Sequence, residues 1–401
     1  MIDLSAAAVR RRTDFWLSHG EWGADDADVR DDLDARMIWS AISEPGDRVA
    51  GALVAACGAR RALDVVHGTS LRASPARRGL PEGLSEKELS EGIARWTPRL
   101  AQAGEAAGAA RRAGVLPLTP GHRRWPRRLD ALGFHAPLCL WVRGDPRALS
   151  SAVSVALVGA RAATAYGEHV AAELSAELAS RGIAVVSGAA YGIDGAAHRA
   201  ALAVGGTTTA WMAGGVDRAY PAGHRTLLER IVSSGGAVAS DVPCGSAPTK
   251  WRFLARNRLI AASSDATVVV EAGWRSGSLN TAGHAAELGR PLGAVPGPVT
   301  SAASAGCHRL LREYDAHCVT GSDDVCELLG VATPPTLFDD AGHADSTRVA
   351  DALSVRSDRQ VAEIAQTAAL SEEATRAALG LLALEGRAVG SGDGRWRASG
   401  R

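Results

Sequence analysis

The chain has 401 residues, enough for roughly two to four domains and a large buried core. Its 44 basic residues balance its 44 acidic residues, so no overall charge draws it to nucleic acid or to a membrane, and any anion site must be local. The six scattered cysteines form no CxxC pair, and no apolar run approaches the roughly 18 residues of a membrane span. We therefore expect a cytoplasmic protein with no metal, no cofactor and no membrane partner.

The first 150 residues predict a helical domain between two less regular segments. Residues 1–33 are polar and rich in Asp and Arg, and we expect little regular structure there. Residues 34–110 repeat short amphipathic patterns such as LDARMIWSAI and DRVAGALVAAC, which predict a small all-α domain. Residues 111–150 form a proline-punctuated arm and then a β-like piece, LCLWVRG, which lead into the next domain.

Residues 151–330 alternate apolar strands with amphipathic helices. We predict strands at 154–160, 183–190, 207–215, 237–243, 266–273 and 292–297, and helices at 166–181, 194–204, 222–233, 251–262 and 279–289. This alternation is typical of a Rossmann-like, doubly wound α/β domain with a mainly parallel sheet covered on both faces. Such sheets bind ligands beyond the carboxyl ends of their strands, so functional residues are expected just after each strand.

The turns after these strands are rich in glycine and hydroxyl groups. Gly159 and Gly188 allow a close approach of backbone to a phosphate, and the helix that follows each turn offers free N–H groups. Arg161 follows the first strand and adds a cation. Further hydroxyl donors stand at Ser187, Ser276, Ser278 and Thr281, with Gly277 among them. Together these turns predict an anion-binding groove.

One helix concentrates positive charge beside aromatic rings. The segment KWRFLARNR places Lys250, Arg256 and Arg258 near Phe253 and the amide of Asn257. Lysine occurs only here and at Lys87, so its retention at this position is notable. Cations that meet phosphates, next to rings that stack on bases, are typical of a groove for single-stranded nucleic acid.

Several enzyme classes find no support in the motifs. The chain has no GxxxxGK[ST] run for a P-loop, no GxGxxG after its first strand and no GxSxG nucleophile elbow. Asp194 and Glu271 are a conceivable pair of catalytic carboxylates. We favour simpler roles for them, Asp194 as the N-cap of its helix and Glu271 as an ordering group at a strand end.

Six ordered motifs resemble the DNA-processing protein A family, also called DprA or Smf. They are VGARAATAYG, SGAAYGIDGAAHRAAL, AGGVDRAYPAGHRTLLERI, FLARNRLIA, EAGWRSGSLNTA and GRPLGAVPG, and the match covers about residues 120–330. The resemblance implies a protein that binds and protects incoming single-stranded DNA in natural transformation and loads RecA recombinase onto it. It also implies a homodimer that acts without catalysis, and a DNA pocket formed by Arg161, Lys250, Phe253 and the run Arg256 to Arg258.

The chain departs from the family pattern at three positions. Ala160 stands where the family has serine, Leu254 where it has proline and His224 where it has asparagine. None of these changes removes a cation or the aromatic ring, so we expect tuned binding rather than its loss. The predicted DNA-binding residues are Gly159, Arg161, Ser187, Gly188, Lys250, Phe253, Arg256, Asn257, Arg258, Ser276, Gly277, Ser278 and Thr281.

The C-terminal residues predict a linker and a further small domain. Residues 331–346 carry prolines and aspartates and are expected to link the α/β domain to this small domain. Residues 347–401 pattern as three helices and a glycine-turned hairpin, a winged-helix-like domain. Its recognition helix would begin Ser371-Glu372-Glu373, and carboxylates there would face phosphates in a major groove. We therefore expect this domain to have a protein-contact or regulatory role.

Two other functions stay open at this stage. A Rossmann-like hydrolase that cleaves the base from a nucleoside monophosphate has a similar sheet, but EAGWRSGSLNTA lacks the paired glycines and the glutamate of its PGGxGTxxE run. Base release from a nucleotide would support it. A protein-interaction scaffold with a vestigial groove is the other alternative, and partner binding that survives loss of the groove cations would support it. For the DNA-binding function, about four cations predict a salt slope near −3.

Overall fold

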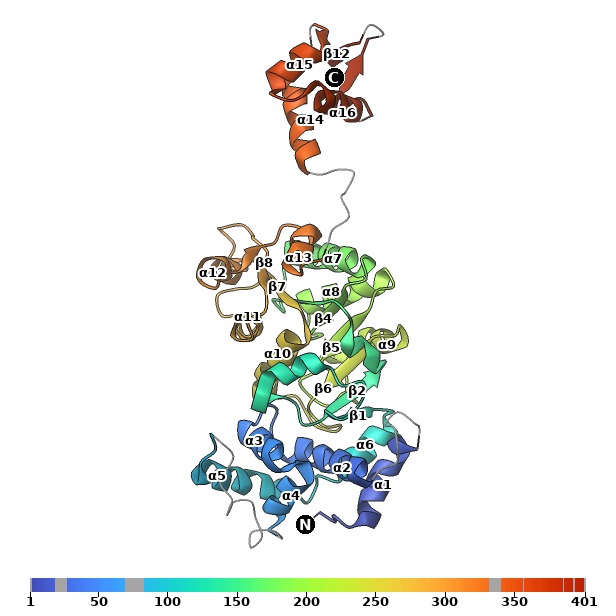
Figure 1. The fold of residues 1–401 in the computed structure, drawn as a ribbon, viewed down its shortest axis with the longest axis vertical. Coiled ribbons are helices and arrows are strands. Elements are labelled where there is room, and N and C mark those ends of the chain that lie inside the picture. The colour runs from blue at the N-terminus through green and yellow to red at the C-terminus, as the bar shows by residue number, and fades with distance from the viewer. Residues whose placement is uncertain are drawn as a thin grey trace. The chain divides into compact units, whose positions relative to one another are not determined.

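The computed structural model describes residues 2–18, 27–68, 83–331, 340–355, 357–384, 386–391 and 394–399. The chain divides into two compact units, residues 1–331 and 332–401 (Figure 1). Each unit has its own hydrophobic core. Within the described ranges, every helix is too short or too polar to cross a membrane.

A nine-stranded sheet organises the first unit, with strand order β1-β2-β6-β5-β4-β3-β7-β8-β9. All neighbours from β6 to β9 are parallel, whereas β1 and β2 add antiparallel strands at one edge. The strands are β1 (Leu116–Leu118), β2 (Leu140–Gly144), β3 (Ser154–Gly159), β4 (Ala184–Ser187), β5 (Thr208–Trp211), β6 (Ala237–Ser240), β7 (Ala266–Glu271), β8 (Leu292–Ala294) and β9 (His317–Cys318). The order runs outward in both directions from β3. This confirms the predicted doubly wound, mainly parallel α/β fold.

Alternate residues of each strand pack into cores on opposite faces of the sheet. On β3, Val155 and Leu157 join one core, and Ala156 and Val158 join the other. The first core contains residues of α7 (Ala165–Ser180), α8 (Ile193–Ala203) and α13 (Ser322–Leu328). The second contains residues of α10 (Lys250–Ser263), α11 (Ser278–Glu287) and α12 (Ala305–Glu313), while α9 (Arg225–Ser233) packs beside β5 and β6. The central strands are therefore largely apolar because both faces are covered.

In the described residues before β1, the α-helices are α1 (Ala6–Leu17), α2 (Ala27–Ile42), α3 (Arg48–Cys57), α4 (Ala59–His67), α5 (Glu86–Trp96) and α6 (Glu105–Arg112). Short 3-10 helices lie at Thr97–Arg99, Arg127–His135, Pro146–Ser150 and Ala222–His224. Residues 2–18 and 27–33 are more regular than the polar composition of this segment predicts. The reason is an apolar face on α1, where Val9, Trp16 and Leu17 are buried and the indole N–H of Trp16 donates to the carbonyl of Val115 at 3.1 Å.

The arm at residues 111–150 belongs to the sheet itself, because it supplies β1 and β2. Trp141 of β2 is fully buried, and its indole N–H donates to Ser40 Oγ on α2 at 3.2 Å. The arm thus joins the N-terminal helices to the sheet through a buried contact.

The second unit contains α14 (Asp340–Ala352), α15 (Val361–Ala368) and α16 (Glu372–Leu384). Its strands β10 (Arg359–Gln360), β11 (Ala388–Gly390) and β12 (Arg395–Ala398) form an antiparallel sheet of order β10-β12-β11. Of the predicted linker, residues 332–339 lie outside the described residues, and α14 begins within it at Asp340. The helices α15 and α16 and the hairpin lie where the sequence predicts them, whereas α14 begins in the predicted linker and ends at Ala352. The winged-helix-like assignment stays a prediction.

A buried histidine makes the stability of the first unit depend on pH. His198 of α8 is inaccessible to solvent, and its Nδ1 lies 2.7 Å from Thr208 Oγ1. Because that hydroxyl donates its own proton to the carbonyl of Val185, the histidine must be the donor, which is the neutral Nδ1–H form. Burial lowers the pKa of His198 to about 3. Above pH 6.5 the unfolded and folded histidines are both neutral, and below it only the unfolded one binds a proton.

We therefore expect the free energy of unfolding to fall by about 2 kcal/mol between pH 7 and pH 5 through this group alone. Urea unfolding at both pH values measures it, with His198→Asn retaining a hydrogen-bonding group near Nδ1 but no titration. The His169→Gln variant, at a histidine whose side chain is 77% exposed, should keep the wild-type pH dependence. Equal pH dependence in the wild type and the His198→Asn variant would contradict the prediction.

Candidate nucleic-acid interface

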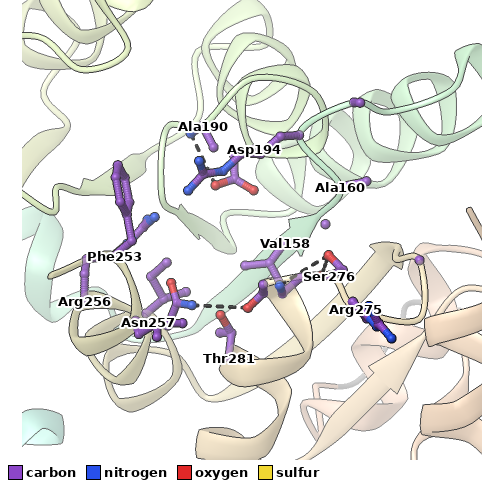
Figure 2. A pocket seen from close by; sticks show the side chains of 18 residues that line it. Val158, Ala160, Ala190, Asp194, Phe253, Arg256, Asn257, Arg275, Ser276 and Thr281 are labelled. Atoms are coloured by element: carbon purple, nitrogen blue, oxygen red, sulfur yellow. Dashed lines mark hydrogen bonds between the residues drawn. The ribbon is translucent and has the colours of Figure 1, made fainter. Parts of the chain in front are cut away.

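A pocket of about 450 Å³ opens beyond the carboxyl ends of β3 and β7, on either side of the point where the strand order reverses (Figure 2). Its wall combines the turn after β3, the start of α8, the first two turns of α10 and the loop from β7 into α11. This is where doubly wound sheets bind their ligands. The pocket therefore brings together residues from Val158 to Thr281 that are far apart in the sequence.

Most of the predicted site residues line this pocket: Gly159, Arg161, Phe253, Arg256, Asn257, Ser276, Gly277, Ser278 and Thr281. The others, Ser187, Gly188, Lys250 and Arg258, do not. The structure thus assembles the β3, α10 and α11 parts of the predicted groove in one place and sets the remaining four residues apart from it.

Arg161 and Phe253 form the open part of the pocket wall. The Arg161 guanidinium carbon lies 4.6 Å from the centre of the Phe253 ring. The centre of the Tyr220 ring lies 5.4 Å from the centre of the same Phe253 ring. Arg161 is exposed, and no carboxylate in the described ranges pairs with it. A cation over a ring supports both side chains without neutralising the charge. Arg161 is therefore available to a phosphate while Phe253 offers an aromatic surface beside it.

Arg256 lies deeper in the pocket wall. It is only 4% exposed, and its Nη1 donates to the carbonyl of Trp211 at 3.1 Å. A Cβ added at Gly188 would lie 1.4 Å from that Nη1, so Gly188 provides the space that the guanidinium fills. Burial lowers the pKa of Arg256 to about 10, and the negative charge of Asp194 partly opposes that shift. The arginine therefore stays charged at neutral pH.

Asp194 is held by the backbone of the loop before its helix. Its carboxylate accepts N–H bonds from Gly188 at 3.2 Å and Ala190 at 3.3 Å. Burial raises its pKa, and the charge of Arg256 is the largest influence in the other direction. The N-cap of α8 is Gly192, with Asp194 in the first turn, so the predicted N-cap role is wrong in position. Asp194 nevertheless accepts hydrogen bonds from backbone N–H groups, as an N-cap side chain does.

The start of α11 supplies hydroxyl groups to the pocket wall. Ser276 Oγ and Ser278 Oγ lie 2.7 Å apart, and the N-cap Gly277 has no side chain to cap the helix. Asn257 of α10 donates its amide to the carbonyl of Gly277 and to Asn280 Oδ1, both at 3.2 Å. Asn257 therefore fixes this loop against α10, and the hydroxyl groups of Ser276 and Ser278 face the pocket as hydrogen-bond donors.

Arg258 is a structural residue, contrary to the sequence prediction. It is 5% exposed, forms an ion pair with Asp241 at 2.6 Å and donates to the carbonyl of His135 at 3.0 Å. The physical reason is helix geometry, because two residues apart on a helix correspond to about 200° of rotation. Arg256 and Arg258 thus project to opposite sides of α10, and only Arg256 reaches the pocket.

Two other predicted residues also lie outside the pocket. Ser187 is fully buried, and its hydroxyl donates to the carbonyl of Leu157 at 2.6 Å, which ties β4 to β3. Lys250 is exposed at the first residue of α10, and no carboxylate among the described residues pairs with it. Lys250 therefore remains an accessible cation near the pocket. Ser187 is buried and cannot contact a ligand there.

Arg275 lines the pocket, and the sequence reasoning missed it. It is exposed, lies in the loop between β7 and α11, and has no ion-pair partner within the described ranges. The sequence could have identified Arg275, because Arg161 was selected as a cation that follows the carboxyl end of a central strand, and Arg275 also follows such a strand. Of the departures from the family pattern, Ala160 and Leu254 line the pocket, whereas His224 is buried with its Nδ1 3.0 Å from the carbonyl of Ala189.

Glu271, the other candidate carboxylate, holds the start of α7. It is 2% exposed and accepts from the Thr164 N–H at 2.8 Å and the Thr164 hydroxyl at 2.6 Å. The residues that line the pocket do not include it. These contacts give Glu271 an ordering role at the strand end.

Comparisons with known proteins agree on one family. The family model described as DNA recombination-mediator protein A matches residues 117–330. A DNA processing protein DprA of Mycobacterium tuberculosis is 48% identical over 307 residues, which are 72% of this chain and 77% of the relative. A Bacillus subtilis DNA processing protein DprA is 33% identical over 221 residues, 55% of this chain and 73% of the relative. The X-ray structure of DprA from Streptococcus pneumoniae aligns with a TM-score of 0.56 and 29% identity, over 73% of this chain and 95% of that one.

Proposed function

Because the chain belongs to the DNA recombination-mediator protein A family, whose relatives are named for DNA processing, we propose that it binds single-stranded DNA in the pocket beyond β3 and β7. The observation that carries the proposal is the pairing of Arg161 with Phe253 at the pocket wall, a free cation next to an aromatic ring. A ring can stack only on a base that is not already stacked in a duplex, which favours a single strand.

The arrangement of the pocket gives each part of the strand a partner. Phosphates would meet Arg161, Arg275 and the hydroxyl groups of Ser276 and Ser278, with Lys250 nearby at the start of α10. A base would stack on Phe253. Every base has an aromatic face, so stacking tolerates any sequence. We therefore propose sequence-tolerant binding.

Membership of the family supports a wider role. We propose that the bound strand is protected in natural transformation and recombination, that the chain acts as a homodimer, and that it loads RecA recombinase. We also propose that it does so without catalysis. The position of Glu271 supports this last point against the nucleotide hydrolase alternative, because both its carboxylate oxygens accept hydrogen bonds from Thr164.

The salt dependence of binding tests the proposal. Three accessible cations, Arg161, Lys250 and Arg275, give an expected slope of log affinity against log salt of about −2 for a single strand. This is shallower than the slope near −3 expected from four cations, because Arg256 and Arg258 are buried. Fluorescence anisotropy of labelled oligo-dT, with duplex of the same length as the comparison, measures both quantities. Binding that ignores salt or prefers the duplex would contradict the proposed site.

A further inference from the structure

A large exposed aromatic residue adjoins the pocket on the side away from Phe253. Trp274 lies in the loop between β7 and α11 and is 57% exposed. Both of its chain neighbours, Gly273 and Arg275, line the pocket. Figure 2 shows Phe253 and Arg275 on opposite sides of the pocket, on α10 and on the loop before α11. The indole of Trp274 is therefore attached to the pocket wall opposite the Phe253 ring.

The Trp274 ring is supported by a second arginine. The Arg309 guanidinium carbon of α12 lies 5.2 Å from the centre of the Trp274 ring and 5.7 Å from that of Tyr314. Arg309 is itself held by Glu313, at 2.7 Å one turn further along α12. A guanidinium over the indole restrains the ring although most of the residue faces solvent. An aromatic side chain that is restrained before a ligand arrives loses less entropy when it stacks.

The two sides of the pocket repeat one arrangement. Arg161 lies over Phe253 at 4.6 Å on one side, and Arg309 lies over Trp274 at 5.2 Å on the other. Arg275, the chain neighbour of Trp274, lines the pocket, and its charge is unpaired among the described residues. Alternating rings and cations along one path match the alternating bases and phosphates of a nucleic acid strand. A protein partner would require no such alternation, and burying Arg275 against it without an acidic group would be costly.

We propose that the single strand bound in the pocket continues past Arg275 and stacks a further base on Trp274. This inference rests on the proposed function and adds a second stacking site to it. The occupant is the same DNA strand, with Arg275 in contact with the phosphate between the pocket and the indole. Trp274 thereby lengthens the binding site by at least one nucleotide toward α12.

The test is a length series of labelled oligo-dT against the wild type and the Trp274→Ala, Trp274→Phe and Phe253→Ala variants. Oligonucleotides too short to reach beyond the pocket should bind Trp274→Ala as they bind the wild type. Longer ones should lose about tenfold in affinity, as expected when one base loses its stacking partner, and Trp274→Phe should recover most of that loss. Phe253→Ala should weaken binding at every length.

A fluorescent base, 2-aminopurine, placed at successive positions of the longer oligonucleotide locates the contact. Its emission should be quenched at one position in the wild type and released there in Trp274→Ala. If Phe253→Ala weakens binding while Trp274→Ala matches the wild type at every length, this inference is wrong and the proposed function stands. If Trp274→Ala instead changes only the oligomeric state in light scattering, the indole belongs to a contact between protein chains. If the wild type binds no oligo-dT, the proposed function fails, and the inference fails with it.

Discussion

Replacing Arg161, Lys250 and Phe253 together by alanine is expected to weaken binding of single-stranded DNA by about 10²- to 10³-fold at moderate salt. Loss of the Phe253 ring accounts for roughly 1–3 kcal/mol, the range measured for one stacked base. Loss of two cations removes two phosphate contacts, so the salt slope should also fall from about −2 to about −1. None of the three side chains is fully buried, and neither cation has a carboxylate partner in the described residues, so the fold should tolerate the change.

The controls separate the ring from the charges. Phe253→Tyr keeps an aromatic face and should bind close to the wild type, whereas Phe253→Leu keeps apolar volume and should bind close to Phe253→Ala. Arg230→Ala removes an exposed arginine of α9 that does not line the pocket, and it should leave affinity and salt slope unchanged. Anisotropy titrations at two salt concentrations measure all variants. Wild-type affinity in the triple variant would show that DNA binds elsewhere.

Arg161 and Phe253 should not contribute independently. Their contact at 4.6 Å means that each single substitution also releases the other side chain. In a double-mutant cycle we therefore expect the two single losses to sum to more than the double loss. Arg256 is left out of these tests, because its removal would open a cavity beside Gly188 and leave the Asp194 carboxylate without its nearest positive charge.

The sheet could be predicted from the sequence because its strands are short, apolar and ended by glycine or by a polar residue. The segment ATVVVEAG predicted a strand at 266–273, and β7 is Ala266–Glu271. Helix ends were equally well marked, since α7 is Ala165–Ser180 where 166–181 was expected. Because such strands are buried on both faces, they appear in the sequence as nearly continuous apolar runs. The β-like segment LCLWVRG corresponds to β2, whereas β1 escaped prediction because Pro117 interrupts it and it pairs antiparallel at the edge of the sheet.

The pocket was predictable only in part, because a sequence shows which residues are charged and not what they face. Arg161 follows a central strand, and the topology alone brings it to the carboxyl edge of the sheet. The arginines of α10 are different, since their environment depends on segments that are distant in the chain. Gly188 was expected to cradle a phosphate, but its missing side chain makes room for Arg256. An arginine that fits against a glycine 68 positions earlier leaves no local signal.

Arg258→Ala should destabilise the first unit by about 3–5 kcal/mol, because it leaves the Asp241 carboxylate buried without its partner. The guanidinium also donates to His135 and lies against Gly46, where an added Cβ would be 3.1 Å from Arg258 Nε. The Arg258 side chain therefore contacts both the turn between α2 and α3 and the segment that follows β6. Loss of it should lower the urea midpoint of unfolding followed by tryptophan fluorescence.

Arg252→Ala is the matched control on the same helix. Arg252 pairs with Glu44 at 3.0 Å, but the Glu44 side chain is 48% exposed, so its loss should cost no more than about 1 kcal/mol. Replacing Arg258 and Asp241 together by apolar residues of similar size should restore much of the stability, since no unpaired charge remains. The folded fraction of Arg258→Ala should bind oligo-dT as the wild type does. Wild-type stability with weakened DNA binding would instead make Arg258 a phosphate contact, as its place in the run Arg256 to Arg258 first predicted.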